Sequence, residues 1–383
     1  MDLARRIPLI LLGLTAAAAC GPKKPVLVPT VFPLTAAWSV DLASPLDAPL
    51  ATDGARVFAT LRDGTVMAID AAGGAVLWKR TAPAGTTVGA APGAVVLRQA
   101  DGLLVRVQPE DGAPLWERQT GIGGSLPPVL DSTEVAVAGE GLALLGLEAG
   151  RPAWGTSGTG RILAPPVLAP HHVLLVDDQG ALKARARSTG AEVWAYTRRG
   201  TPAAAPAIFR DRVFVGTVQD RVTSLKLDKG SAGWSWRVGA DPSVTPAVTD
   251  KLVLVASEDN VLWALGRGNG DMQWRAPLPS RPLSAPLLLP GGVVVACRET
   301  DLVGFDLASG QRIGAFTTPG EMRVPPVLVG ERLVVGLRGP WRLQGFGLNM
   351  TGRAPKAAPR PGQATKPKQQ QKGAAKARPT AQP

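Results

Sequence analysis

The chain is poor in the residues that most active sites and metal centres use. Its 383 residues include two histidines, two cysteines and one tyrosine, and only 19% of them are charged. His171 and His172 follow Pro170 with no cysteine or third histidine nearby, so we expect turn residues and no metal site. The sequence has no CxxCH haem motif, no GxSxG nucleophile motif and no phosphate-binding glycine loop. These absences favour a non-catalytic protein that holds no cofactor.

Charge of one sign is also scarce outside the C-terminal segment. The net charge is +12, and residues 351–383 supply eight of these charges without a single acid. Basic stripes interleaved with aromatic residues are lacking, which argues against a nucleic-acid partner. The segment is rich in Pro, Ala and Lys and has no aromatic residue, so we predict a disordered basic tail. The tail is either simply solvated or adheres to an anionic envelope surface.

The only strongly apolar run near the N-terminus, residues 7–14, is shorter than the ~20 residues that span a bilayer. With Arg5 and Arg6 before it and small residues after it, it predicts a signal peptide over residues 1–19. Cys20 directly follows and resembles the acylated cysteine of a bacterial lipobox, although Ala17 stands where that motif usually has leucine.

Two interpretations of Cys20 remain open. The first is a lipidated N-terminus, with residues 20–34 as a lipid-anchored tether. The second is ordinary cleavage after Ala19, which leaves Cys20 as an incidental thiol. We favour the first because an exposed thiol is a liability outside the cytoplasm. Cys297 lies in an apolar run predicted to be buried, so it offers no disulfide partner.

What the sequence has in abundance is Gly (45), Pro (36) and Trp (10), and these residues recur with a regular period. Except for the first, each periodic tryptophan follows a glycine by four positions. A second series, of prolines before short apolar runs, keeps the same period and is missing only near Gly89. Two series at one period of 38–40 residues indicate an internal repeat. The tryptophans in register are Trp38, Trp78, Trp116, Trp154, Trp194, Trp234 and Trp274.

Each repeat predicts four short strands. In residues 48–80, apolar runs are separated by Asp53-Gly54, Asp63-Gly64 and Gly73-Gly74. Asp-Gly between alternating runs is typical of tight hairpins, and four antiparallel strands at this period are typical of a propeller blade. We expect each periodic tryptophan to fill the gap between its blade and the next, with its N–H bonded to a backbone carbonyl. The seventh repeat has Gly314 and no tryptophan.

The ends of the array predict how it closes. Eight first strands are expected, near residues 49, 89, 128, 166, 206, 246, 286 and 326. The last repeat has three strands, and a lone fourth-type strand around Trp38 precedes the first repeat. Joining the two pieces removes exposed sheet edges. The sequence thus predicts an all-β, eight-bladed β-propeller over residues 35–350, made of four-stranded antiparallel blades and closed by the N-terminal strand.

The run from Met67 to Trp78, MAIDAAGGAVLW, resembles the blade repeat of the quinoprotein-type, or PQQ-like, propeller family. One branch of that family contains PQQ- and calcium-dependent dehydrogenases, which carry long insertions and often a vicinal cysteine pair. The other contains short BamB-like lipoproteins of the outer-membrane β-barrel assembly machinery. Repeats of 38–40 residues leave no room for such insertions, and Cys20 and Cys297 are far apart.

The resemblance therefore implies a non-catalytic periplasmic scaffold, anchored to the outer membrane by its N-terminal lipid and bound to the barrel-assembly complex. A PQQ-binding quinoprotein dehydrogenase or sensor is the alternative. A cell-wall-binding adaptor that relies on the basic tail is a third hypothesis.

Candidate partner-binding residues lie on one predicted face, where the turns between second and third strands carry acids and the blade connections carry arginines. These charges either form a docking surface around the channel mouth or reflect turn chemistry, which we favour for the acids because Asp is common in tight turns. Arg198 and Arg199 are the better candidates because no turn geometry requires two arginines. Trp341 lies outside the tryptophan register, after Gly339-Pro340, and we expect it to be exposed as an anchor for a partner.

Overall fold

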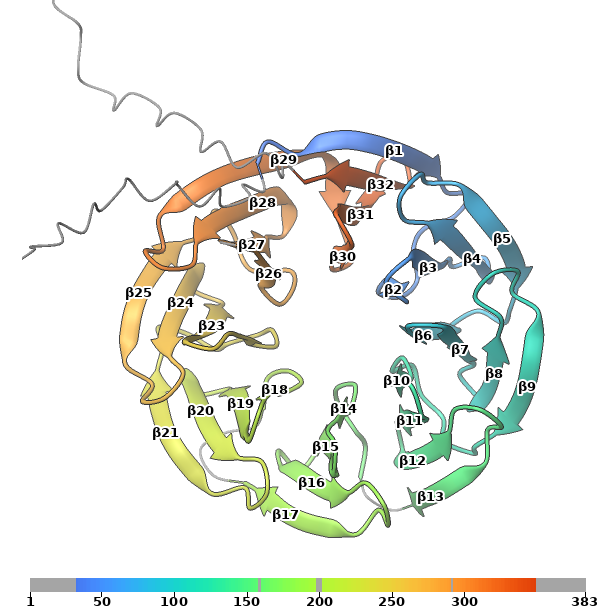
Figure 1. Cartoon of the computed structure of the whole chain (residues 1–383), viewed down its shortest axis with the longest axis horizontal. Helices are drawn as coiled ribbons and strands as arrows, with labels where there is room; N and C mark the ends of the chain where they lie inside the picture. Colours follow the sequence, from blue (N-terminus) through green and yellow to red (C-terminus); the bar gives the residue numbers. More distant parts are fainter. Residues whose placement is uncertain (1–31, 158–159, 198–201, 291, 349–383) are drawn as a thin grey trace, which may run out of the picture. The chain divides into compact units, whose positions relative to one another are not determined.

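The computed structural model describes residues 32–157, 160–197, 202–290 and 292–348. Every regular element in these ranges is a β-strand, and the strands form a ring of eight blades (Figure 1). No helix in the described ranges has the length and apolarity needed to cross a membrane. The predicted all-β propeller is confirmed.

Each blade is a meander of four antiparallel strands, numbered in chain order. Blades 1 to 3 comprise β2 (Ala51–Thr52), β3 (Arg56–Thr60), β4 (Thr65–Asp70), β5 (Val76–Thr81), β6 (Thr87–Ala91), β7 (Ala94–Arg98), β8 (Leu103–Val107), β9 (Pro114–Gln119), β10 (Val129–Leu130), β11 (Glu134–Ala138), β12 (Gly141–Gly146) and β13 (Pro152–Ser157). Blades 4 to 6 comprise β14 (Val167–Leu168), β15 (His172–Val176), β16 (Leu182–Ala186), β17 (Glu192–Tyr196), β18 (Ala207–Phe209), β19 (Arg212–Thr217), β20 (Arg221–Lys226), β21 (Ala232–Arg237), β22 (Ala247–Val248), β23 (Leu252–Ser257), β24 (Val261–Gly266) and β25 (Met272–Pro277).

The last two blades share one sheet. Blade 7 comprises β26 (Leu287–Leu289), β27 (Gly292–Ala296), β28 (Glu299–Asp306) and β29 (Arg312–Met322), and blade 8 comprises β30 (Val327–Val329), β31 (Arg332–Arg338), β32 (Arg342–Gly347) and β1 (Thr35–Asp41). The long β29 continues past blade 7 and pairs with β31 through Glu321–Arg338 and Met322–Leu337. This pairing was not expected from the repeat, which predicts a separate sheet for each blade.

The ring closes through the N-terminal strand, as the sequence predicts. β1 pairs antiparallel with β32 from Thr35–Gly347 to Asp41–Arg342, and it forms the outermost strand of blade 8. The Leu42 N–H also donates to the Trp341 carbonyl (2.9 Å), which extends the contact past the strand. Closure therefore joins residues from opposite ends of the described chain.

The first strands of the blades face the centre of the ring, and the fourth strands form its rim (Figure 1). The second and third strands carry the core, because their apolar side chains are buried on both faces between neighbouring blades. Close packing explains why blade 2 has glycine where the other repeats have a proline before the first apolar run. A Cβ on Gly89 would lie 2.0 Å from the Pro128 carbonyl oxygen, so only glycine allows β6 and the start of blade 3 to approach this closely.

Candidate functional site

The seams between blades are built by the periodic tryptophans. Each indole Nε1 donates to a backbone carbonyl of the following blade over 2.7–3.0 Å, and the acceptors lie in the turn between third and fourth strands. The indole thus fills apolar space between blades and satisfies a carbonyl at a chain reversal. The pairs are Trp38–Ala71, Trp78–Pro109, Trp116–Leu147, Trp154–Arg187, Trp194–Leu227, Trp234–Arg267 and Trp274–Leu307.

A glycine of the same turn lies against each indole ring. Gly230, for example, has φ +63°, and a Cβ there would lie 2.6 Å from the Trp194 ring. Glycine serves twice at this position, since it tolerates the left-handed backbone and leaves room for the indole. Each glycine that lies four residues before one tryptophan therefore packs against the tryptophan of the preceding blade.

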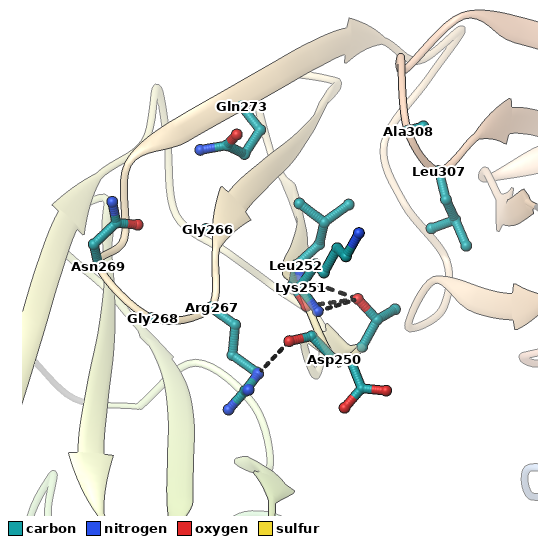
Figure 2. Close-up of a pocket in the computed structure, with 11 residues that line it drawn as sticks. Asp250, Lys251, Leu252, Gly266, Arg267, Gly268, Asn269, Gln273, Leu307 and Ala308 are labelled. Atoms are coloured by element: carbon teal, nitrogen blue, oxygen red, sulfur yellow. Dashed lines mark hydrogen bonds between the residues drawn. The ribbon is translucent and has the colours of Figure 1, made fainter. Parts of the chain in front are cut away.

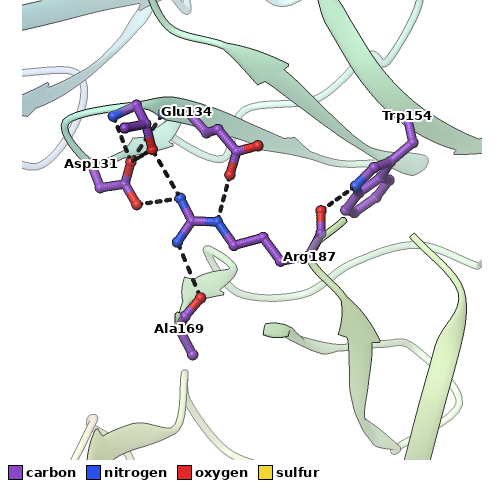
Figure 3. Close-up of polar contacts among 6 residues, drawn as sticks. Asp131, Glu134, Trp154, Ala169 and Arg187 are labelled. Carbon is purple, nitrogen blue, oxygen red and sulfur yellow. Dashed lines mark hydrogen bonds and ion pairs between the residues drawn. The ribbon is translucent and has the colours of Figure 1, made fainter. Parts of the chain in front are cut away.

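Between blades 3 and 4 the seam carries a partly buried ion-pair cluster (Figure 3). Arg187 donates from Nε to Glu134 and from Nη2 to Asp131, and its Nη1 bonds the Ala169 carbonyl over 3.1 Å. Its own carbonyl accepts the Trp154 indole N–H. Burial alone would raise the pKa of Asp131, but hydrogen bonds from Arg187 and from the Thr133 and Glu134 backbone lower this pKa to about 2. The cluster is satisfied within the ring, which indicates a structural role.

A pocket of about 740 Å³ lies between blades 6 and 7 (Figure 2). Lys251, Asn269 and Gln273 contribute polar groups to its lining, and Leu252 and Leu307 contribute apolar surface. Asp250 is held beside it by the Arg210 guanidinium (2.6 Å) and accepts at its backbone carbonyl from Arg267 (2.8 Å). The lining offers hydrogen-bonding groups to a ligand, and the Asp250 carboxylate in this lining is paired with Arg210.

The opposite face of the ring carries the turns between second and third strands together with the blade connections. Turn chemistry accounts for the acids there: the Asp63 and Asp101 carboxylates accept backbone N–H groups two residues on, and Asp177 accepts those of Gln179 and Ala181. Other acids pair with arginines, as in Glu258–Arg281 (3.2 Å) and Glu321–Arg323 (2.9 Å).

Two large apolar side chains are exposed on this face. Leu163, in the connection between blades 3 and 4, is 47% exposed, and Val218, in a turn of blade 5, is 39% exposed. The other large hydrophobic residues found exposed in the described ranges lie on outer strands at the rim.

Several predicted site residues lie outside the described ranges. These are Cys20, Arg198 and Arg199, together with the basic tail. Trp341 differs from expectation because it is only partly exposed. It packs against the core between blades 8 and 1, and the Arg338 guanidinium lies 5.9 Å from its ring centroid. Its position after a Gly-Pro turn brings the indole back onto the ring instead of outward.

The histidines occupy the turn into β15. Burial lowers the pKa of His172, and the neighbouring His171 lowers it further, while Asp228 opposes the shift. Among the described residues, no three His, Cys, Asp or Glu side chains come together as a metal site would require.

Sequence reasoning missed three residues. Arg98 is fully buried in blade 2, Arg187 links two blades, and Phe32 packs into the ring although it belongs to the predicted tether. Arg98 and Arg187 look like ordinary surface arginines in the sequence. Phe32 had a detectable signal, since it is an aromatic residue just before β1, and the seventh repeat lacks its tryptophan.

Four-stranded blades with this Trp–Gly seam define a PQQ-like β-propeller. The family model for the outer membrane protein assembly factor BamB matches residues 35–145, 100–208 and 179–323. These segments together span most of the chain, and the protein belongs to the BamB family.

Solved structures share the fold at low sequence identity. BamB from Moraxella catarrhalis is 19% identical with a TM-score of 0.69, and the match covers 82% of this chain and 100% of that one. The computationally designed Ika8 protein is 15% identical with a TM-score of 0.69, over 80% of this chain and 98% of that one. Quinohemoprotein alcohol dehydrogenase from Comamonas testosteroni is 13% identical with a TM-score of 0.67, over 84% and 78%. A sequence search of curated proteins finds no match to this chain.

Proposed function

We propose that this protein is a non-catalytic, lipid-anchored scaffold on the periplasmic side of the outer membrane, which binds a protein partner in β-barrel assembly. The observation that carries the proposal is the match of the BamB family model from β1 to the end of β29. The size of the blades supports it. The connections between described strands are short, and long insertions that could build a substrate pocket are lacking in the described ranges.

The face that carries the blade connections is a better candidate for the partner-binding surface than the face with the pocket. Leu163 and Val218 expose apolar surface there, and Arg161 is exposed two residues before Leu163. In the sequence, Arg198 and Arg199 fall between β17 of blade 4 and β18 of blade 5. Apolar anchors with arginines around them are a composition that protein interfaces favour. Trp341 extends this candidate surface only through the part of its ring that is exposed.

Co-purification from detergent-solubilised envelope tests the proposal. We expect the full-length protein to recover components of the barrel-assembly machinery, and the double variant L163E/V218E to lose at least ten-fold of that recovery. M272E is the matched control, because Met272 is 43% exposed on β25 at the rim. Recovery of no barrel-assembly component by the wild type would overturn the role, and equal recovery by both variants would overturn the surface.

Lipid attachment is tested separately. We expect fatty-acid label on the wild type and none on Cys20→Ser. Absence of label from the wild type would leave ordinary cleavage after Ala19 as the better interpretation, and label on Cys20→Ser would show that Cys20 is not the acylated residue. Retention on anionic vesicles and on isolated cell wall at low salt should fall when residues 351–383 are deleted if the tail binds an envelope surface. Unchanged retention on both would remove the adhesion of the tail and the cell-wall adaptor hypothesis.

A quinoprotein dehydrogenase or sensor is the second candidate, favoured by the structural likeness to the quinohemoprotein alcohol dehydrogenase. Addition of PQQ and calcium should then give quinone absorbance on the protein and dye-linked oxidation of alcohols or sugars. We expect neither result for a scaffold, and either one would contradict our proposal.

A further inference from the structure

The seam between blades 7 and 8 lacks the tryptophan that joins the other blades. By register, Gly314 of β29 occupies the tryptophan position, since it pairs with Gly304 just as Trp274 pairs with Ala264 one blade earlier. A register shift follows directly after both pairs, so the two blades are equivalent at this point. Blade 7 therefore presents two adjacent glycines where its neighbours present an indole.

Phe32 fills the space above these glycines. A Cβ on Gly314 would lie 2.5–2.7 Å from Cδ2, Cγ and Cβ of Phe32, and a Cβ on Gly304 would lie 2.4 Å from Cε2. The Phe32 side chain is 4% exposed and belongs to a core cluster with Leu302 of blade 7 and Phe346 of blade 8. Phe32 therefore occupies the space that a side chain at position 314 would fill.

We propose that Phe32 is the seam residue of blade 7, supplied by the N-terminal tether in place of a tryptophan, and that the two-glycine notch is an intramolecular docking site for the tether. Leu34, 6% exposed, enters the same cluster and reinforces the docking. Phenylalanine has no side-chain hydrogen-bond donor. At this seam β29 of blade 7 pairs directly with β31 of blade 8.

The docking fixes the position of Phe32, at the N-terminal end of the described residues. Phe32 lies 12 positions after Cys20, and 12 residues reach at most ~40 Å. If Cys20 carries the lipid, a point that rests on the proposed function, the membrane is held within this distance of blades 7 and 8. The notch itself is independent of lipidation and of any partner, so its tests stand apart from those of the scaffold role.

A double-mutant cycle on the full-length protein tests the replacement. Phe32→Ala empties the notch, and we expect the melting temperature to fall by roughly 5–10 °C. Gly314→Trp should also lower it, because the indole and Phe32 cannot occupy one notch. The combined variant F32A/G314W should melt above both single variants, since the indole then fills the empty space. A combined variant that melts as low as the sum of the two losses would overturn the replacement.

A cross-link tests the docking without relying on stability. In a C20S background, cysteines at 32 and 314 would lie side by side, since a Cβ on Gly314 lies 2.7 Å from that of Phe32. A shift of about 1 Å would bring the two Cβ atoms to the ~3.8 Å that a disulfide needs. We expect oxidation to give an intrachain disulfide, seen as a mobility shift without reductant. The control pair F32C/G54C should give none, because a Cβ on Gly54 would have no other atom within 4 Å. Failure of F32C/G314C to cross-link would show that the tether does not dock there.

Discussion

Glycines beneath the seam tryptophans meet two demands at once, and substitution separates them. Gly230 has φ +63° and lies under the Trp194 ring, whereas Gly330 has φ +55° and a Cβ there would have no other atom within 4 Å. We expect Gly230→Ala to destabilise the protein by about 3 kcal/mol and Gly330→Ala by about 1 kcal/mol, because only the first adds overpacking to the backbone strain. Urea unfolding measures the loss of stability in both variants. Equal losses would contradict the packing of the Trp194 ring against Gly230.

The ion-pair cluster of Arg187 predicts a dependence on pH. The pKa of Asp131 is lowered from 3.8 to about 2 in the folded protein, so its contribution is fully present above about pH 4 and is lost as the pH falls towards 2. Asp131→Asn keeps an oxygen for the Thr133 and Glu134 N–H groups but removes the charge. We expect the variant to be less stable than the wild type at pH 7, with a difference that shrinks between about pH 4 and pH 2. A difference that stays constant across this window would contradict the ion pair.

At this scale the sequence predicted the repeated residues and missed the unrepeated ones. The seven periodic tryptophans could be assigned to the gaps between blades because they recur at the period of the blade. Arg187 occurs at the position where other repeats have Ala71, Pro109 or Leu147, and nothing local indicates that it reaches across to Asp131. Its partners belong to the preceding repeat and become neighbours only when blades 3 and 4 stack.

Among the elements, β7 carries an unusual cation at its end. Arg98 is 0% exposed and donates to the carbonyls of Ile122, Leu126 and Ala138 over 2.6–2.9 Å. Burial lowers its pKa to about 10, so it remains charged at neutral pH. The side chain ties blade 2 to the glycine-rich connection and to the end of β11 in blade 3.

We expect Arg98→Met to cost about 3 kcal/mol, because it leaves three buried carbonyls without their donor. Arg80→Met is the control, since Arg80 bonds a single carbonyl, that of Gly112, from a half-buried position. We expect it to cost about 1 kcal/mol in the same unfolding experiment. An Arg98→Met variant as stable as the control would show that the three bonds contribute little.

Strand positions were largely predictable, because Asp-Gly turns and alternating apolar runs are local features. The observed first strands start close to the expected positions, from Ala51 in blade 1 to Val327 in blade 8. The extension of β29 into β31 was not predictable. It depends on Glu321 and Met322 meeting Arg338 and Leu337, residues that belong to different repeats.

For the whole ring, closure by β1 predicts a contrast between two truncations. Deletion of residues 1–41 removes β1 and Phe32 and exposes the edge of β32, an unpaired strand that invites association. We expect this variant to melt at a lower temperature and to form oligomers in size-exclusion chromatography. Deletion of residues 1–31 keeps both features and should give a monomer that melts like the wild type. Monomeric behaviour of the larger deletion would contradict closure by β1.

The sequence by itself determined the period, the number of blades and the strand that closes the ring, because each of these follows from local spacing repeated eight times. Only the tertiary structure decided which unrepeated residues hold the ring together. Arg98, Arg187 and Phe32 act across seams between blades, and their contacts form only after the blades have packed against each other. The missing tryptophan at Gly314 marked one seam as different, and the packing of the tether onto that glycine showed how the chain fills it.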